Sequence, residues 1–265
     1  MAADEALRAA AYGIEARTVA AVCDSERVED WGRVYLTPSL PLVWDASLIE
    51  LRASGLPIDA VVALADNALG GAGLAHRTVV VAAEAEGRRL AAEVASAIAE
   101  APGWSAERIL YMAWREGRSE RRPQATAREA PLREIAPLRG ELIKSWLRPG
   151  EPHEETAAQL LERDRRLGKF AGDRWFVSPA AGDPAAACRL LWVDGVAQVE
   201  DVGTLPRARR RGLAQAVVLA AVAAARRDGA DEIVIAADAD DWPHQLYAKL
   251  GFEPVGEATV LRRLP

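Results

Sequence analysis

A basic turn between a strand-like stretch and a long apolar helix is the part of the sequence best suited to chemistry. Val199–Thr204 has the branched residues of a strand, and Pro206 ends its pairing because proline has no N–H to donate. Arginines crowd the turn that follows, and the residues from Leu213 to Arg226 are mostly Ala, Val and Leu, which favours a buried helix. The first N–H groups of a helix have no partner within it and carry partial positive charge. The turn therefore predicts a binding site for a phosphate or diphosphate group.

Such a turn can hold only part of a ligand. Two or three charge-assisted hydrogen bonds supply roughly 5–8 kcal/mol before the cost of association is subtracted, whereas micromolar binding needs about 8 kcal/mol. If the edge of the preceding strand is open at Val202–Thr204, an extended amide-bearing group can pair with it as an added strand. At the helix start, Gly212 has no Cβ to block the approach of a phosphate.

Two short segments of this region carry the pattern of a known family. Residues 209–214 read Arg-Arg-Arg-Gly-Leu-Ala, and residues 246–252 read Leu-Tyr-Ala-Lys-Leu-Gly-Phe. The first resembles the Arg/Gln-x-x-Gly-x-Gly/Ala signature of the GCN5-related N-acetyltransferase (GNAT) superfamily, and the second is similar to that family's Leu-Tyr-x-Lys-x-Gly-Phe segment. The resemblance covers about residues 131–265. It implies an α/β (α+β) fold with a mixed, mostly antiparallel central sheet flanked by helices.

The resemblance also implies acetyl-CoA as co-substrate and assigns residues to it. These are the strand end, the arginine-rich turn, the first helical residues and two positions further on: Val202, Gly203, Thr204, Arg209, Arg210, Arg211, Gly212, Leu213, Ala214, Asp240 and Tyr247. At Asp240 relatives often have an Asn that bonds the pantetheine arm. A carboxylate can accept such a bond but cannot donate one, so this position departs from the family.

Two residues are expected to act in catalysis. Tyr247 aligns with the family tyrosine that protonates the departing thiolate, and its alternative role is only to pack against the sheet. Glu200 lies where many relatives have a carboxylate that acts as a base through water. Its alternatives are to bind a cationic substrate or to pair with an arginine. Asp201 is expected to face the other way, because neighbours on a strand alternate, and N–H groups near Val202 would polarise the acetyl carbonyl.

Composition and charge exclude several other classes of protein. With 265 residues, of which 50% are hydrophobic and 27% charged, the chain can form one or two domains with a proper core. The net charge of −6 argues against a general nucleic-acid or membrane-surface binder. Cys23 and Cys188 lack metal-ligand spacing, and neither lies in the motifs. We therefore expect no metal, no covalent acyl-enzyme, no membrane span or signal peptide, and a cytoplasmic protein.

The N-terminal half repeats the order of strand, glycine, apolar helix and strand. Gly87 opens a predicted helix over 87–99, with nearly the spacing seen around Gly212. The position equivalent to Arg209 holds Glu84, whose carboxylate would repel a diphosphate. We interpret residues 1–120 as a degenerate GNAT-like copy without a cofactor site, in tandem with the C-terminal one. An unrelated α/β domain is the alternative.

A polar stretch with two prolines marks the boundary between the halves. It places a linker at 121–130 and the acetyl-CoA-binding domain at 131–265. Helices are expected near residues 3–15, 58–69, 137–146, 154–167 and 213–226, and strands near 31–35, 42–51, 77–82, 109–114, 174–178, 188–193, 197–204, 232–236 and 259–262. Asp194–Gly195 predicts a hairpin turn.

The sequence thus predicts an N-acetyltransferase in which a primary amine of a small molecule or peptide attacks acetyl-CoA directly in a ternary complex. One alternative is a non-catalytic CoA-binding sensor or interaction protein of the same fold. Another is a transferase that uses a different acyl-CoA. The motifs identify neither the acceptor nor the acyl chain, and they leave a homodimer open.

Overall fold

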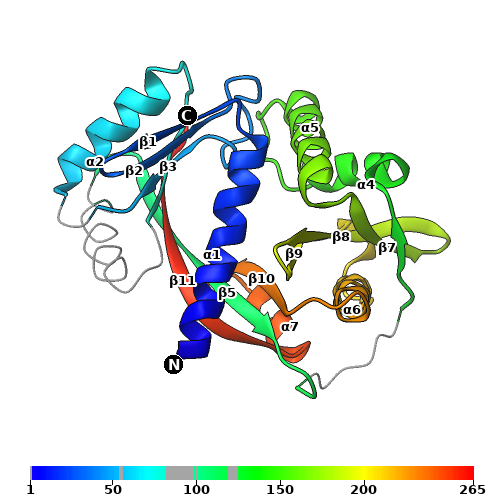
Figure 1. Cartoon of the computed structure of the whole chain (residues 1–265). Coiled ribbons are helices and arrows are strands. Elements are labelled where there is room, and N and C mark those ends of the chain that lie inside the picture. The colour runs from blue at the N-terminus through cyan, green and yellow to red at the C-terminus, as the bar shows by residue number, and fades with distance from the viewer. Residues whose placement is uncertain (1, 54–55, 82–97, 99–100, 119–124) are drawn as a thin grey trace. The chain divides into compact units, whose positions relative to one another are not determined.

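The chain folds into two compact units (Figure 1), here called the first and second unit. This computed structural model describes residues 2–53, 56–81, 98, 101–118 and 125–265. The first unit comprises residues 1–111, 237–242 and 255–265, and the second comprises 112–236 and 243–254. The first long segment thus ends at Tyr111, and two short segments near the C-terminus join it. The domain bounds expected around a linker at 121–130 stay a prediction. Residues 119–124 and Glu84 lie outside the described residues, and so does the predicted helix 87–99 apart from residue 98.

The first unit is built on a sheet whose strands follow the order β1-β2-β3-β4-β11-β5. Its elements are α1 (Ala2–Val22), β1 (Ser25–Glu29), β2 (Gly32–Leu36), β3 (Leu48–Leu51), α2 (Ile58–Ala65), a π-helical turn (Asp66–Gly70), β4 (Arg77–Val81), most of β5 (Trp104–Trp114) and most of β11 (Phe252–Arg263). The expected strand at 42–51 is confirmed only in its last four residues. The expected helix at 3–15 continues to Val22.

The two faces of this sheet carry different helices. Strand side chains alternate, so that Val34, Ile49 and Val79 pack in one core cluster with Val61 and Ala65 of α2. The neighbouring positions in the same strands point to the other face and line a pocket against α1; they are Tyr35, Leu48, Glu50 and Val80. Both faces of the sheet in the first unit are therefore covered, one by α2 and the other by α1.

The last strand of the chain completes the sheet of the first unit. β11 runs antiparallel to β4. Arg263 pairs with Arg77 at one end of the register, and Thr259 pairs with Val81 at the other. Its Leu261 is fully buried in the same core cluster as the β3 and β4 side chains. The strand expected at 259–262 is therefore confirmed. Its partner β4 lies about 180 residues earlier in the sequence, and no local sequence pattern indicates that the two strands pair.

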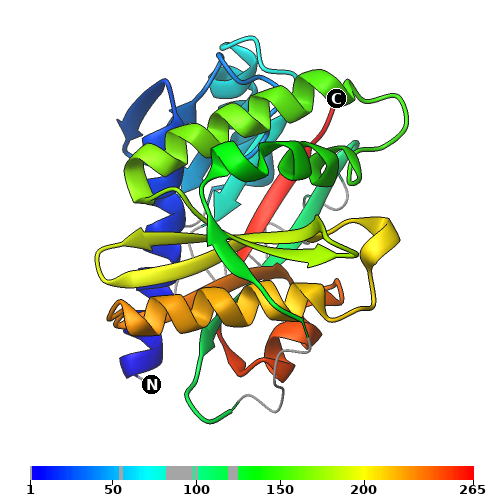
Figure 2. The ribbon, with the colours of Figure 1, turned by 90° about the vertical axis from the view of Figure 1, so that its right-hand side faces the viewer.

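The second unit has three layers, with α4 and α5 on one face of its sheet and α6 on the other (Figure 2). Its strands follow the order β11-β5-β10-β9-β8-β7-β6, in which only the ends of β11 and β5 belong to this unit. The elements are β6 (Arg128–Ala130), α4 (Leu132–Lys144), α5 (His153–Ala171), β7 (Arg174–Ala180), β8 (Asp183–Val193), β9 (Val196–Thr204), a 3-10 turn (Pro206–Ala208), α6 (Leu213–Arg227), β10 (Glu232–Asp238) and α7 (Pro243–Lys249). No helix of the described residues is long and apolar enough to cross a bilayer.

Local chemistry explains the part of this unit that leads into the site. The turn expected between β8 and β9 is present, with Asp194 and Gly195 both at positive φ (47° and 82°), the backbone of a tight hairpin. β10 then runs parallel to β9, while β6, β7, β8 and β9 are antiparallel neighbours. The sheet is therefore mixed but mostly antiparallel, as predicted.

We expect Leu261→Ala to destabilise the first unit. The substitution empties a fully buried position in its core cluster, and such truncations cost about 2–5 kcal/mol. Denaturant unfolding together with hydrogen exchange in β3 and β4 would measure the loss. Glu257→Ala, at an exposed position of the same strand, should change stability by less than about 0.5 kcal/mol. Equal effects of the two substitutions would contradict the role given to β11.

Candidate active site

β9 and β10 run side by side for only part of the length of β9. Their parallel register covers Val196–Val199 and ends at the pair Val199 and Ile235. β9 continues to Thr204 and stays paired with β8 on its other side, through Gly203 and Thr204. Within the described residues, the last five residues of β9 have no register partner in β10. One backbone edge of this strand end is therefore open, as expected for Val202–Thr204, whereas its contact with a cofactor stays a prediction.

A β-bulge marks the place where the two strands diverge. Arg189 of β8 pairs with Glu200, but Ala187 pairs with Gly203, so that a single residue, Cys188, faces both Asp201 and Val202. Asp201 has a φ of 53°, in the left-handed region that residues other than glycine seldom occupy. A bulge of this kind bends its strand and increases the local twist. It explains why β9 leaves β10 at this point.

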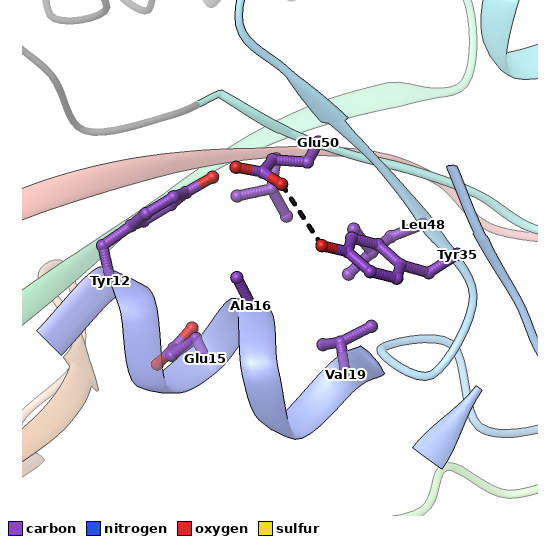
Figure 3. A pocket seen from close by; sticks show the side chains of 8 residues that line it. Tyr12, Glu15, Ala16, Val19, Tyr35, Leu48 and Glu50 are labelled. Atoms are coloured by element: carbon purple, nitrogen blue, oxygen red, sulfur yellow. Dashed lines mark hydrogen bonds between the residues drawn. The ribbon is translucent and has the colours of Figure 1, made fainter. Parts of the chain in front are cut away.

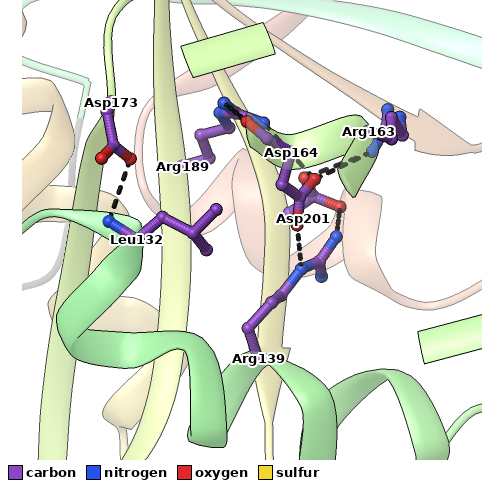
Figure 4. Close-up of polar contacts among 7 residues, drawn as sticks. All are labelled: Leu132, Arg139, Arg163, Asp164, Asp173, Arg189 and Asp201. Carbon is purple, nitrogen blue, oxygen red and sulfur yellow. Dashed lines mark hydrogen bonds and ion pairs between the residues drawn. The ribbon is translucent and has the colours of Figure 1, made fainter. Parts of the chain in front are cut away.

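Buried ion pairs hold the bulge in place (Figure 4). Arg139 of α4 donates from Nε to Asp164 of α5 at 2.8 Å and from Nη2 to Asp201 at 2.6 Å. Arg139 and Asp164 are almost completely buried. Burial alone would raise the pKa of Asp201, but the guanidinium groups of Arg139, Arg163 and Arg189 outweigh it and hold this pKa below its usual range. Asp201 is therefore charged at neutral pH.

Two tryptophans enclose the guanidinium groups of this cluster. Arg139 lies 5.3 Å from the ring centroid of Trp146 and 5.2 Å from that of Trp175, and Arg189 lies 5.2 Å from Trp175. Arg189 also donates to the backbone carbonyl of Asp164 at 2.7 Å. Burial lowers the pKa of Arg189, and the carboxylates of Asp164 and Asp201 offset part of this change. Both helices on this face of the sheet are thereby tied to the bulge.

Glu200 has a different partner from its neighbour Asp201. The Gln198 amide donates to Glu200 Oε1 at 2.9 Å, whereas Asp201 is held by Arg139 of α4. The two adjacent carboxylates thus have separate partners. Glu200 is half-buried at the start of the open strand end, where a carboxylate can accept a proton through water. Its role as a base stays a prediction.

The arginine-rich turn has the backbone shape of an anion site. Arg210 and Gly212 are both left-handed, with φ of 63° and 76°, a feature of the concave turns that bind anions. Gly212 is the N-cap of α6 and provides no side-chain cap. The first bond within the helix runs from Ala216 N–H to the Gly212 carbonyl, so the N–H groups of Leu213 and Ala214 have no partner inside it.

The guanidinium groups of this turn are exposed. Arg207 pairs with Glu141 at 2.9 Å, and Arg209 donates from Nε to the Thr204 carbonyl at 3.3 Å. In the part of the chain that the structure describes, no carboxylate lies within ion-pair distance of Arg209, Arg210 or Arg211. Their positive charge is therefore available to a ligand at the helix start.

Tyr247 lies on α7 and is almost completely buried. Its ring meets Phe252 edge to face at 6.2 Å. Burial, with a smaller contribution from the Cys188 thiol, raises the pKa of Tyr247 above its usual range, so the phenol stays protonated at neutral pH. Burial also raises the pKa of Cys188, which keeps its thiol protonated.

Asp240 belongs to the first unit and has a protein partner there. Its carboxylate accepts from Arg108 Nη2 at 2.7 Å, and Arg108 also lies 3.7 Å from Glu257. A bond from Asp240 to the pantetheine arm stays a prediction, and it would compete with this ion pair. The described residues contain no group of His, Cys, Asp and Glu side chains that could hold a metal ion.

Sequence reasoning missed the residues that support the bulge: Arg139, Trp146, Asp164, Trp175 and Arg189. One signal for them is present in the sequence. Arg139 stands four residues after Ile135 and three before Leu142, so it occupies the apolar stripe of α4. A charged residue in such a stripe needs a buried partner, although the stripe does not say which one.

Residues 140–252, in the half that carries the two motifs, match the model of the acetyltransferase (GNAT) family, as those motifs predicted. Members of this family transfer acyl groups from acyl-CoA, so acyl transfer is the general class of activity. No curated protein sequence matches the chain significantly.

Solved structures share the fold. A conserved protein of unknown function from Staphylococcus epidermidis ATCC 12228 superposes with a TM-score of 0.66 at 12% identity, over 90% of this chain and 93% of that one. A GCN5-related N-acetyltransferase from Kribbella flavida gives 0.59 at 20% identity, over 95% of both chains. A tandem GNAT protein from the clavulanic acid biosynthesis pathway gives 0.52 at 15% identity, over 87% of this chain and 77% of that one. The predicted fold class is confirmed, and the tandem neighbour agrees with a GNAT-like N-terminal copy.

We expect Arg139→Met to be strongly destabilising. It removes the nearest guanidinium partner of Asp164 and Asp201, leaving them only the more distant Arg163 and, for Asp164, Arg189. Removing one partner of a buried ion pair costs about 3–5 kcal/mol. Arg128→Met is the matched control, because it breaks an exposed pair with Glu134 and should cost less than about 1 kcal/mol. Urea unfolding would compare them. A small loss for Arg139→Met would show that the cluster does not hold the bulge.

We expect the cost of Asp201→Asn to depend on pH. The pKa of Asp201 is lower in the folded protein than the value of about 3.9 for an unfolded chain. The carboxylate therefore contributes stability above about pH 4 and loses it as the pH falls through its folded-state value. The unfolding free energies of wild type and Asp201→Asn should differ at pH 7 and converge toward pH 3. Asp183→Asn, at an exposed position, provides the baseline, and a constant difference would contradict the assignment.

Proposed function

We propose that this protein is an N-acetyltransferase that transfers the acetyl group of acetyl-CoA to a primary amine of a small molecule or peptide. One observation carries the proposal. The open, bulged end of β9 leads directly into a turn of exposed arginines at the uncapped start of α6. A thioester ligand whose extended pantetheine arm leads into a diphosphate needs these two features in this order.

The two parts of the ligand would be held by different interactions. Its diphosphate would accept from the N–H groups of Leu213 and Ala214 and from the side chains of Arg209 to Arg211, since charge-assisted bonds are worth about 1.5–3 kcal/mol each. The amides of its pantetheine arm would pair with the open edge at Val202–Thr204 as an added strand. The adjacent N–H groups would stabilise the oxyanion formed at the thioester carbonyl.

The chemistry needs a base and an acid. Glu200, through water, would take the proton of the substrate ammonium, and the free amine would attack the thioester carbon. As the tetrahedral intermediate collapses, the C–S bond breaks and Tyr247 gives its proton to the thiolate. Overall, one ammonium and one thioester give one amide, one thiol and one proton. The protonated, buried thiol of Cys188 is a poor nucleophile, which favours direct attack by the amine.

Calorimetric titration with acetyl-CoA tests the proposal first. One site per chain, followed by turnover with some amine, supports it. If acetyl-CoA binds but no amine is acylated with any acyl-CoA, the result would favour a CoA-binding sensor of the same fold. Tighter binding and faster turnover with a longer acyl-CoA would favour another donor. Two sites per chain would contradict the interpretation of the N-terminal half as a copy without a cofactor site.

Arg209→Glu should weaken acetyl-CoA binding by about ten- to hundredfold, the equivalent of one charge-assisted bond plus repulsion of the diphosphate. The fold should be unaffected, because Arg209 is exposed. Arg165→Glu, an equal change of charge on the exposed side of α5, serves as control for net charge. Unchanged affinity in Arg209→Glu, measured by calorimetry, would remove this arginine from the diphosphate site.

Tyr247→Phe should lower kcat by about 10²–10⁴-fold, the usual contribution of a positioned acid, and leave the affinity for acetyl-CoA nearly unchanged. The substitution keeps the ring that meets Phe252. Tyr111→Phe removes a hydroxyl from another buried tyrosine and is the matched control. If wild type and Tyr247→Phe turn over at equal rates, Tyr247 is a packing residue and another group supplies the proton.

A further inference from the structure

An exposed tryptophan lies against the open end of β9. Trp146 follows α4 in a turn in which its N–H donates to the Ile143 carbonyl at 3.0 Å. A Cβ added to Gly203 would lie only 3.1 Å from Cζ2 of Trp146 and 3.1 Å from Cδ2 of Leu142. The indole therefore packs directly on the backbone of Gly203, which has no side chain to hold it away.

The buried neighbours of Gly203 indicate on which side of the strand the free part of the indole lies. Gly203 pairs with Ala187 of β8, and Ala187 belongs with Leu142 to one fully buried core cluster. The β8 side of Gly203 is therefore filled. Trp146 by contrast is 46% exposed. Its free part lies toward the other side, where this end of β9 has no register partner in β10 within the described residues.

Arg139 holds the ring in this position. Its guanidinium lies 5.3 Å from the ring centroid of Trp146 and 5.2 Å from that of Trp175, which belongs to β7. Since β7 and β9 lie on opposite sides of β8, Trp175 is the inner ring of the pair and Trp146, on Gly203, is the outer one. A buried charge thus anchors one face of the outer indole. Its exposed remainder forms a fixed wall beside the open strand end.

This wall stands where an acyl group would lie. In the proposed function, on which this inference rests, the thioester carbonyl lies near Val202 and the pantetheine arm pairs along Val202–Thr204. The sulfur and the acyl group would then be about one residue, or roughly 3.3 Å of strand, from the contact of Trp146 with Gly203. We propose that Trp146 limits the length of the acyl group. An acetyl group fits beside the indole, whereas a longer chain meets the ring.

The ring can exclude a longer chain because it has little freedom to move aside. The backbone of Gly203 lies beneath it and the guanidinium of Arg139 lies over it. In a site of fixed shape, one methylene group more or less changes selectivity by about 10–200-fold. Trp146 is thus a specificity residue for the donor, distinct from the residues that bind the diphosphate.

Calorimetric titrations with acetyl-CoA and butyryl-CoA, whose chain has two more methylene groups, test this role. Wild type should bind acetyl-CoA at least about tenfold more tightly than butyryl-CoA. In Trp146→Ala this preference should disappear or reverse, because the space left by the indole takes up the chain and each buried methylene is worth about fourfold in affinity. The ratio of the two kcat/KM values with one amine acceptor should change in the same direction.

Three further variants separate the ring from the fold. Trp146→Phe keeps a smaller ring for Arg139 and should give an intermediate preference. Phe170→Ala removes another half-exposed aromatic side chain, near the end of α5, and should keep the wild-type preference. Val19→Ala, in the pocket between α1 and the sheet of the first unit (Figure 3), should keep it as well. Thermal unfolding checks that each variant is folded, and if Trp146→Ala is not, Trp146→Phe takes its place in the comparison.

The outcomes distinguish this inference from the proposed function. An unchanged preference in a folded Trp146 variant, with acetyl-CoA still bound, would overturn the inference and leave the function standing. A variant in which only the KM for the amine changes would also overturn it, because the ring would then face the acceptor instead of the acyl chain. If wild type binds neither acyl-CoA, the proposed function fails and this inference fails with it.

Discussion

The buried ion pairs of Arg139 with Asp164 and Asp201 are the constraint on which the geometry of the second unit depends. Each charge loses several kcal/mol of hydration on burial, by general estimates, and regains it only while the pairing geometry is kept. The left-handed backbone of Asp201 costs about 1–3 kcal/mol more. The same ion pairs offset both the lost hydration and the backbone strain, because they satisfy the buried charges and also hold the bulged strand against α4 and α5. Any movement of β9 would break the pairs, so the open strand end has a fixed direction.

From this fixed strand end, the remaining parts of the site follow along the chain. Pro206 and the left-handed Arg210 and Gly212 reverse the backbone before α6 begins. The arginines of that turn stay exposed, while those that secure the bulge are buried. The protein thus uses arginine for two purposes within the second unit. Buried guanidinium groups set the shape of the strand, and exposed ones carry charge that a ligand can meet.

The sequence predicted the parts of the structure that local chemistry determines. β9, the turn and α6 were expected within one or two residues, because proline, glycine and a run of Ala and Val act on their own neighbours. The bulge could not be predicted, since it depends on an ion pair between residues 62 apart in sequence. The same limit explains why 42–47 was taken for strand: Val43 and Ala46 are buried, but in irregular backbone. It also explains why the pairing of β11 with β4 has no signal in the sequence.

The pairing of β11 with β4 also bears on how the protein is made. During synthesis the chain leaves the ribosome from its N-terminus, at roughly 5–20 residues per second. β4 is complete after Val81, but β11, the strand that pairs with it, begins only at Phe252. The sheet of the first unit is therefore completed only after most of the second unit has been synthesised, and until then β11 does not cover the edge of β4. The N-terminal unit thus completes its sheet after the strands β6 to β10 are available, and not before them.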